Sequence, residues 1–169
     1  MSSSIDNNTL ASIQLVAFDV DGVFTDGRFY LSNDGIESKA FSTQDGYGIR
    51  RLVDAGVSVA VISGRSSAAV EQRMHELGVR FIVQGCSDKI AAFDAMTAEL
   101  GIADKACAYV GDDIPDLPLL NKVGVAFAVA NAVADVKTQC DYVTSAAGGF
   151  GAVREVCDLL LDARPQDAK

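Results

Sequence analysis

Acidic residues form two tight groups in this sequence. Asp19 and Asp21 lie two positions apart in the segment FDVDG, and Asp112, Asp113 and Asp116 lie together in the segment GDDIPD. Side chains at alternate positions of an extended chain point to the same side, so Asp19 and Asp21 can act at one site. Several carboxylates in one place repel one another unless a cation lies among them, and oxygen ligands favour Mg²⁺ over zinc or copper. The two groups therefore predict a carboxylate-bound Mg²⁺.

Hydroxyl and basic residues that suit an anionic substrate stand between these groups. Ser63, Gly64 and Arg65 in the segment ISGR, together with Lys89, are the candidates for substrate binding. Ser63 and Lys89 can supply a hydroxyl donor and a fixed positive charge to phosphoryl oxygens, whereas the planar guanidinium of Arg65 suits two-point recognition of a carboxylate. Because His75 is the single histidine, histidine-based triads and histidine-rich metal sites are disfavoured.

The paired acids divide naturally into a nucleophile and a proton carrier. If Asp19 attacks phosphorus and forms an aspartyl-phosphate, Asp21 is free to protonate the leaving alcohol and then to deprotonate the water that hydrolyses the intermediate. Mg²⁺ would lower the repulsion between Asp19 and the phosphate and orient the phosphorus for attack. The predicted catalytic residues are thus Asp19, Asp21, Ser63 and Lys89, and the predicted reaction is phosphomonoester hydrolysis.

Short apolar runs alternate with helical patterns along the chain. Near-continuous apolar strands that alternate with amphipathic helices predict an α/β fold, a doubly wound, mostly parallel Rossmann-like sheet with helices on both faces. Ligands of such sheets bind at the carboxyl ends of the strands, where the acidic groups, the segment ISGR and Lys89 fall. The predicted strands are Leu15–Val20, Val57–Ile62, Val79–Val83, Ala106–Val110 and Val125–Val129, and apolar helical stripes span Ile49–Val53, Val70–Leu77, Ile90–Leu100 and Val153–Leu161.

The segment Arg28–Phe41 departs from this alternation. Its residues follow the pattern of a β-hairpin, and Ser32–Gly35 supplies turn-forming residues, so we expect a β-hairpin flap after the first strand. The rest of the chain leaves room for one core. We expect a flexible N-terminal tail over 1–12, a single domain over 13–163 and a C-terminal tail over 164–169.

Composition limits the partners and the setting. A net charge of −9 disfavours binding to nucleic acid or to an anionic membrane. The sequence shows neither a targeting signal nor an apolar run of membrane-spanning length, so we expect a soluble, cytoplasmic protein. The four cysteines form no CxxC pair, which is typical of reduced thiols rather than zinc or disulfide sites.

Four motifs in order, FDVDG, ISGR, Lys89 and GDDIPD, closely resemble those of the haloacid dehalogenase-type phosphatases. The resemblance implies that Asp19 is the nucleophile and a metal ligand. It further implies that Asp21 is the general acid and base, binding the metal through its backbone carbonyl, and that Asp112 is the third protein ligand. Asp113 and Asp116 are expected behind these ligands, orienting a neighbour or reaching the metal through water.

A receiver domain with an aspartyl phospho-acceptor shares these residue types, but its acceptor follows the third strand. A catalytically silent subunit is disfavoured because every catalytic position is filled.

The resemblance is strongest to the 3-deoxy-D-manno-octulosonate 8-phosphate phosphatase family, including related sugar-acid phosphatases. It spans nearly the whole chain, through DVDGVFTDGRFY, KAFSTQDGYGIRRL, QGCSDK, AYVGDDIPDLPLL and GGFGAVREVCDLLL. The implied substrate is 3-deoxy-D-manno-octulosonate 8-phosphate, in lipopolysaccharide precursor synthesis, with a nonulosonate 9-phosphate as the alternative. Relatives often have arginine at the positions of Gln44 and Phe150, so two possible contacts to a sugar acid differ here.

The sequence has no room for the cap domain that usually covers small substrates in the wider superfamily. An uncapped site suits either a macromolecular substrate or a neighbouring subunit that closes the site. The family resemblance favours the second answer. It implies a homotetramer in which the flap hairpins pack together and the C-terminal segment of one subunit reaches the active site of another.

Overall fold

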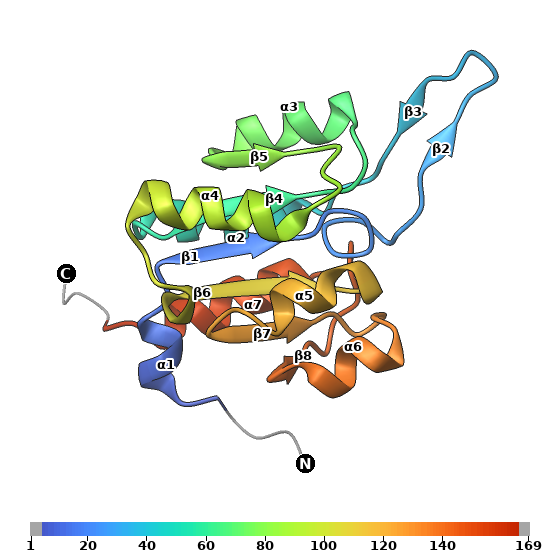
Figure 1. Ribbon diagram of the computed structural model, residues 1–169. Helices are drawn as coiled ribbons and strands as arrows, with labels where there is room; N and C mark the ends of the chain where they lie inside the picture. Colours follow the sequence, from blue (N-terminus) through green and yellow to red (C-terminus); the bar gives the residue numbers. More distant parts are fainter. Residues whose placement is uncertain (1–4, 166–169) are drawn as a thin grey trace.

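The computed structural model describes residues 5–165 and contains a central parallel sheet (Figure 1). Six strands lie in the order β5-β4-β1-β6-β7-β8, and every neighbouring pair is parallel. This confirms the predicted α/β class. The strands are β1 (Leu15–Phe18), β4 (Ser58–Ile62), β5 (Phe81–Val83), β6 (Cys107–Gly111), β7 (Val125–Ala128) and β8 (Tyr142–Val143).

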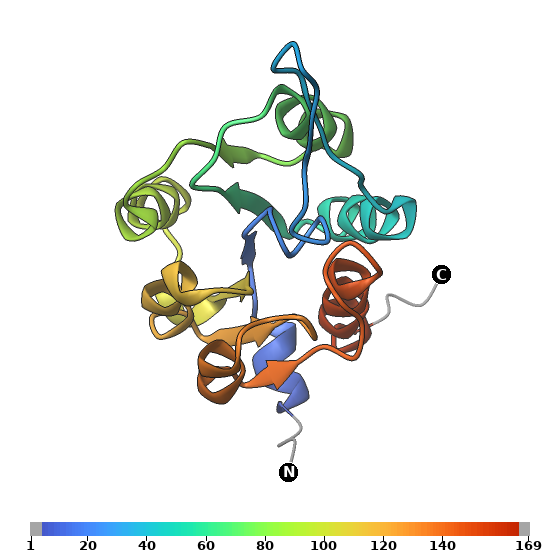
Figure 2. The same ribbon diagram turned by 90° about the vertical axis from the view of Figure 1, so that its right-hand side faces the viewer.

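Helices cover both faces of this sheet, as Figure 2 shows in the view onto the carboxyl ends of the strands. On one face lie α2 (Thr43–Asp54) and α7 (Ala152–Asp162). On the other lie α4 (Lys89–Leu100), α5 (Leu117–Leu120) and α6 (Ala134–Gln139), while α3 (Ala68–Leu77) lies towards the β5 edge. The remaining short elements are α1 (Asn7–Ala11) and the 3₁₀ turns η1 (Asp104–Ala106) and η2 (Ile114–Asp116).

The two central strands are buried along their whole length. In β1 and β6 every residue is buried, because helices shield both faces of the sheet at its centre. The α2–α7 layer is tight: a Cβ added to Gly48 would lie 3.1 Å from the Cβ of Cys157. Such close packing leaves little room for a side chain at Gly48 and holds the two helices together.

The predicted flap is an antiparallel hairpin of β2 (Tyr30–Leu31) and β3 (Glu37–Ser38), which leaves the body at the carboxyl ends of the strands (Figure 1). Ser32 closes the turn, because its amide donates to the Ile36 carbonyl at 3.0 Å and its hydroxyl accepts from the Ile36 amide at 3.0 Å. The hairpin exposes four large apolar side chains, Phe29, Tyr30, Leu31 and Ile36.

The ends of the chain differ from the predicted tails. Residues 7–11 form α1 rather than a flexible tail, since the Asp6 side chain caps the helix by accepting from the Thr9 amide and Leu10 is buried. At the other end, the Arg164 side chain donates to the Ile13 carbonyl. The parts of the predicted tails at 1–4 and 166–169 lie outside the described residues.

Other short elements also did not follow from the sequence patterns, and β8 and α6 are examples. The strand β8 has only two residues and the helix α6 has six, too few for a clear period. All four cysteines are free thiols, as predicted. No helix over residues 5–165 is long and apolar enough to cross a membrane.

Candidate active site

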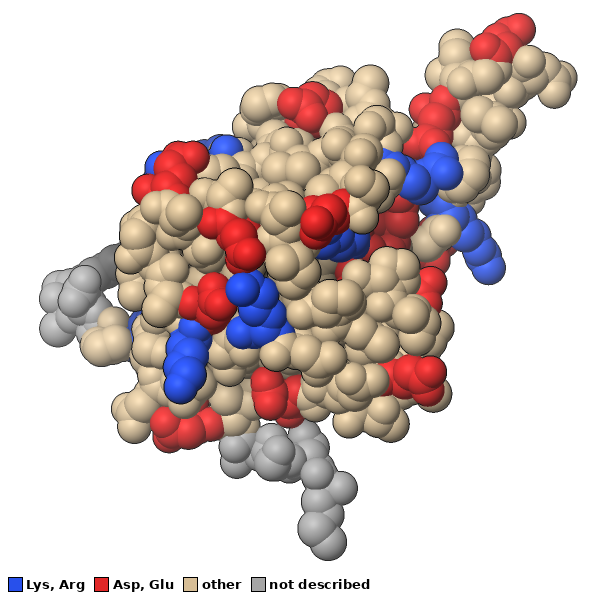
Figure 3. Space-filling view, viewed as in Figure 1, with Lys and Arg blue, Asp and Glu red and all other residues tan. Residues whose placement is uncertain are grey.

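A cavity of about 310 Å³ lies at the carboxyl ends of β1, β4 and β6, at the base of the flap. Figure 3 shows acidic and basic side chains gathered where the flap meets the body. Every site residue predicted from the sequence lines this cavity: Asp19, Asp21, Ser63, Gly64, Arg65, Lys89, Asp112, Asp113 and Asp116. The sequence therefore predicted which side chains come together.

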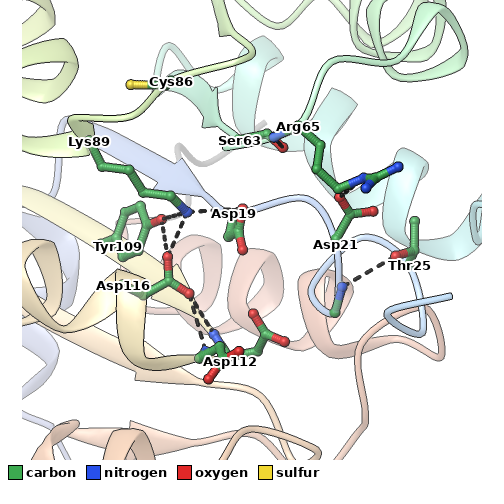
Figure 4. Close-up of polar contacts among 12 residues, drawn as sticks. Asp19, Asp21, Thr25, Ser63, Arg65, Cys86, Lys89, Tyr109, Asp112 and Asp116 are labelled. Carbon is green, nitrogen blue, oxygen red and sulfur yellow. Dashed lines mark hydrogen bonds and ion pairs between the residues drawn. The ribbon is translucent and has the colours of Figure 1, made fainter. Parts of the chain in front are cut away.

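Asp19 is held at the end of β1, next to β6. Its amide donates to the Val110 carbonyl at 3.0 Å and so extends the parallel ladder by one bond. Its carboxylate faces Lys89, whose Nζ lies 3.1 Å from Oδ1 (Figure 4). Burial and the nearby Asp116 raise the pKa of Asp19 to about 6, although Lys89 opposes the shift. Asp19 thus points its carboxylate into the cavity from a rigid position.

Lys89 is fixed by three oxygen atoms. It is the first residue of α4, whose N-cap is Asp88, and its Nζ donates to Asp116 Oδ1 at 2.7 Å and to the Tyr109 hydroxyl at 3.2 Å. Asp19 Oδ1 is the third partner. Burial alone would lower the pKa of Lys89, but the carboxylates of Asp19 and Asp116 outweigh it and raise that pKa. Lys89 is therefore a permanent cation at the floor of the site.

Asp116 uses both carboxylate oxygens on protein donors. Besides Lys89, Oδ1 accepts a hydrogen bond from the Tyr109 hydroxyl at 2.7 Å, and Oδ2 accepts from the amides of Asp112 and Asp113 at 2.9 and 3.3 Å. Oxygens of Asp19, Asp112 and Asp116 all lie within 4.8 Å of one another. Both Asp116 oxygens are thus occupied by protein donors, which tie Asp116 to Lys89 and to the loop after β6. Tyr109, a buried aromatic on β6, gave no sequence signal for this role.

The donor set at the cavity fits a hard divalent cation. Burial, together with Asp19, Asp116 and Asp113, raises the pKa of Asp112 to about 8, so Lys89 alone does not balance the negative charge of the ionised cluster. Carboxylate and carbonyl oxygens in such a group are the ligands that Mg²⁺ prefers. Asp113 is less available to bind a metal, because its Oδ1 caps η2 by accepting a hydrogen bond of 2.7 Å from the Ile114 amide.

The loop after Asp21 is clamped from two sides. Gly22 turns the chain with φ of +88°, and the buried Thr25 hydroxyl accepts from the amides of Gly22 and Gly27, each at 3.2 Å. On the other side, Asn131 donates to the Gly22 carbonyl at 3.1 Å and accepts from the Gly148 amide at 2.6 Å. Neither Thr25 nor Asn131 was predicted, since both act through backbone atoms that only the fold brings near.

The residues after strand β4 that were predicted to bind the substrate line one side of the cavity. Ser63 is buried, and its hydroxyl accepts from the Arg65 amide at 3.2 Å. The Arg65 guanidinium is about half exposed and lies 4.1 Å from the ring centre of Phe29 on the flap. Its Nη2 donates to Glu37 Oε2 at 2.6 Å. Arg65 thus lines the cavity next to the flap, half exposed and paired with Glu37.

Known proteins are similar to this chain in sequence and in fold. A haloacid dehalogenase-like hydrolase family model matches residues 81–155. The 3-deoxy-D-manno-octulosonate 8-phosphate phosphatase of Escherichia coli K12 is 49% identical over 150 residues, which span 89% of this chain and 80% of that protein. The chain belongs to the 3-deoxy-D-manno-octulosonate 8-phosphate phosphatase family. This membership confirms the predicted hydrolase class and rules out the receiver-domain alternative.

Solved structures of the phosphatase family superpose closely on the chain. The enzyme from Yersinia pestis matches with a TM-score of 0.92 at 44% identity, covering 94% of this chain and 85% of that one. The enzyme from Moraxella catarrhalis, solved with a magnesium ion, a phosphate ion and a KDO molecule, matches with a TM-score of 0.91 at 44% identity, covering 94% and 91%. The predicted Rossmann-like fold is confirmed, and a relative holds the predicted metal.

Proposed function

We propose that this protein hydrolyses 3-deoxy-D-manno-octulosonate 8-phosphate to 3-deoxy-D-manno-octulosonate and inorganic phosphate, with Mg²⁺ as its cofactor. One observation carries the proposal: in a chain of this phosphatase family, the predicted nucleophile, proton carrier, lysine and acidic ligands line a single cavity. The Moraxella catarrhalis relative, which holds Mg²⁺, phosphate and KDO, supports both the substrate and the metal.

Asp19 and Asp21 carry the covalent steps. A carboxylate oxygen of Asp19 forms a bond to phosphorus while the bond from phosphorus to the sugar oxygen breaks, and Asp21 gives its proton to that oxygen. Asp21 then takes a proton from a water molecule, which attacks the phosphorus of the aspartyl-phosphate while the bond from phosphorus to the Asp19 oxygen breaks. Phosphate leaves, and both aspartates return to their starting state.

The remaining residues of the cavity hold charge in place. Lys89 and Ser63 line the cavity, where they would face the phosphoryl oxygens and stabilise the charge that builds up during transfer. Asp19, Asp112 and the backbone carbonyl of Asp21 would hold the metal. When bound, Mg²⁺ neutralises negative charge shared by the carboxylates and the phosphate. Arg65 would bind the carboxylate of the sugar acid.

We further propose that the active form is a homotetramer. Support comes from the flap, where Tyr30 and Leu31 have exposed fractions of 67% and 65%. Large apolar side chains that lie next to one another on a surface are typical of a protein interface. Phe150, on the loop before α7, is 72% exposed and is available to a neighbouring subunit.

The free cysteines fit a reducing, cytoplasmic location, where lipopolysaccharide precursors would be made. Residues 13–163 would form the single phosphatase domain.

The decisive experiment measures Mg²⁺-dependent phosphate release from purified protein. We expect kcat/KM for 3-deoxy-D-manno-octulosonate 8-phosphate to exceed the values for a nonulosonate 9-phosphate and for glucose 6-phosphate by at least about 10-fold. A higher value for the nonulosonate 9-phosphate would instead assign the alternative substrate. Failure to hydrolyse any of the three with Mg²⁺ present would refute the proposal.

A further inference from the structure

Glu37 in strand β3 of the flap and Lys39 just after this strand direct charged side chains towards residues of the active site. Glu37 and Lys39 lie two positions apart, so they face the same side of the extended chain, whereas Ser38 between them is exposed. The Lys39 side chain is only 1% exposed. Burying an ammonium group costs free energy unless acidic groups pair with it, so the partners of Lys39 are needed to stabilise its position.

The partner of Lys39 is the predicted proton carrier. Lys39 Nζ contacts Asp21 Oδ1, and it lies 3.6 Å from Glu37 Oε1. The other oxygen of Asp21 lies 3.8 Å from Arg65 Nε, and Arg65 Nη2 bonds to Glu37 Oε2 at 2.6 Å. The four side chains therefore form a closed ring in which acidic and basic residues alternate, Asp21, Lys39, Glu37 and Arg65.

This ring gives each catalytic aspartate a lysine of its own. Lys89 contacts Asp19 but not Asp21, and Lys39 contacts Asp21 but not Asp19, among the ion pairs of the described residues. Asp21 needs such a partner because it lies beyond the end of β1, on the segment that turns at Gly22. The backbone hydrogen bonds between β1 and β6 that hold Asp19 stop at Asp19, so they do not hold Asp21 in place.

We propose that Lys39 is a positioning residue that holds the Asp21 carboxylate in the orientation for proton transfer, and that Glu37 positions Arg65 for the substrate. The inference rests on the proposed function and adds the flap to the machinery of that site. Misplacing a catalytic group by about 1 Å typically costs about 100-fold in rate, so a lost Asp21 partner should act on kcat. Loss of the Arg65 partner should act on KM instead.

The test compares the steady-state kinetics of Lys39→Met, Lys39→Arg and Glu37→Gln at saturating Mg²⁺. We expect Lys39→Met to lower kcat about 10- to 100-fold with KM within about 3-fold of wild type, and Lys39→Arg to recover most of that loss. Glu37→Gln is expected to raise KM for the sugar-acid phosphate about 10-fold. Its KM for p-nitrophenyl phosphate, which lacks a carboxylate, should stay within about 3-fold.

Ser38→Ala is the matched control, because it changes the same strand on its exposed face. Thermal unfolding of each variant shows whether the fold is kept, and Lys39→Arg, which retains the positive charge, serves if Lys39→Met does not fold. The inference is wrong if Lys39→Met keeps kcat within about 2-fold, or if Lys39→Arg unfolded normally yet recovered nothing. An inactive wild type would defeat the proposed function itself, whereas an active wild type with an unaffected Lys39→Met would defeat only the positioning role.

Discussion

The hydroxyl of Tyr109 donates a hydrogen bond of 2.7 Å to Asp116 Oδ1 beneath the active-site cavity. Both side chains are almost fully buried, and the same Asp116 oxygen also accepts from Lys89. Burial and the surrounding carboxylates raise the pKa of Tyr109, which keeps the phenol protonated and therefore a donor. A tyrosine in the middle of the sheet thus helps to hold Lys89 in place at the floor of the cavity.

Removing this one hydroxyl should affect both stability and turnover. Tyr109→Phe keeps the ring, so we expect a loss of about 1–3 kcal/mol in the free energy of unfolding and about 10-fold in kcat. Tyr142→Phe is the matched control, because its hydroxyl bonds to Glu155 at 2.9 Å, away from the cavity. Urea denaturation and steady-state kinetics distinguish the two variants. Equal kcat in both would remove Tyr109 from the positioning of Lys89.

Gly22 is expected to be irreplaceable for a reason beyond its backbone conformation. A Cβ at Gly22 would overlap the Asp112 carboxylate, so Gly22→Ala should weaken Mg²⁺ binding at least about 10-fold, as measured by calorimetric titration. Gly56 has nearly the same positive φ, +80°, with no atom within 4 Å of an added Cβ. Gly56→Ala should therefore suffer the backbone strain but bind Mg²⁺ normally. Normal metal binding by a folded Gly22→Ala would contradict the assignment of Asp112.

Metal-free protein should lose stability as the pH rises. The folded pKa of Asp112, about 8, lies above its ordinary value of 3.8, so this carboxyl stabilises the fold when protonated. That contribution is complete below about pH 4 and is lost as the pH rises through about 8. Mg²⁺ binds the ionised form, so its addition should raise Tm more at about pH 8 than at about pH 6.

Thermal melts in EDTA and in excess Mg²⁺ at both pH values test this coupling. In Asp112→Asn, which cannot ionise, the Mg²⁺-induced rise in Tm should nearly disappear. An equal rise in Tm at the two pH values in the unsubstituted protein would show that Asp112 does not titrate with the metal.

The nucleophile assignment predicts a sharp separation of activity from folding. Asp19→Asn should lower phosphate release by about 1,000-fold or more while the circular dichroism spectrum stays unchanged. In Asp21→Asn we expect slow turnover with a trapped aspartyl-phosphate, detectable as a mass increase of the intact protein. Robust turnover by Asp19→Asn would exclude it as the nucleophile.

The assembly proposal depends on the apolar flap. Leu31→Asp places a charge on a side chain that is 65% exposed in the single chain, so it should leave folding intact but prevent a subunit interface at the hairpin. Light scattering should then report a monomer, with activity reduced because the site stays open. A fully active monomer would defeat the idea of a shared site.

The sequence predicted those site residues that stand next to clearly patterned strands and helices. Asp19, Asp112 and Lys89 stand directly at the ends or starts of strongly patterned elements, so their meeting followed from the parallel topology. Lys39 and Tyr109 could not be predicted in their roles. The first depends on how the flap leans over Asp21, and the second on which face of a fully buried strand points towards the cavity. Burial on both faces removes the alternation that would have shown it.

The pairing of β1 with β6 brings Leu15 opposite Cys107, residues far apart along the chain. A site made where such distant strands end cannot exist in a partly folded intermediate that contains only local structure. Long-range parallel pairing is slow because the loop must close before the contacts form. On dilution from denaturant, catalytic activity would therefore be among the last signals to recover. Activity requires the complete sheet, whereas the circular dichroism of helices can recover before the sheet is complete.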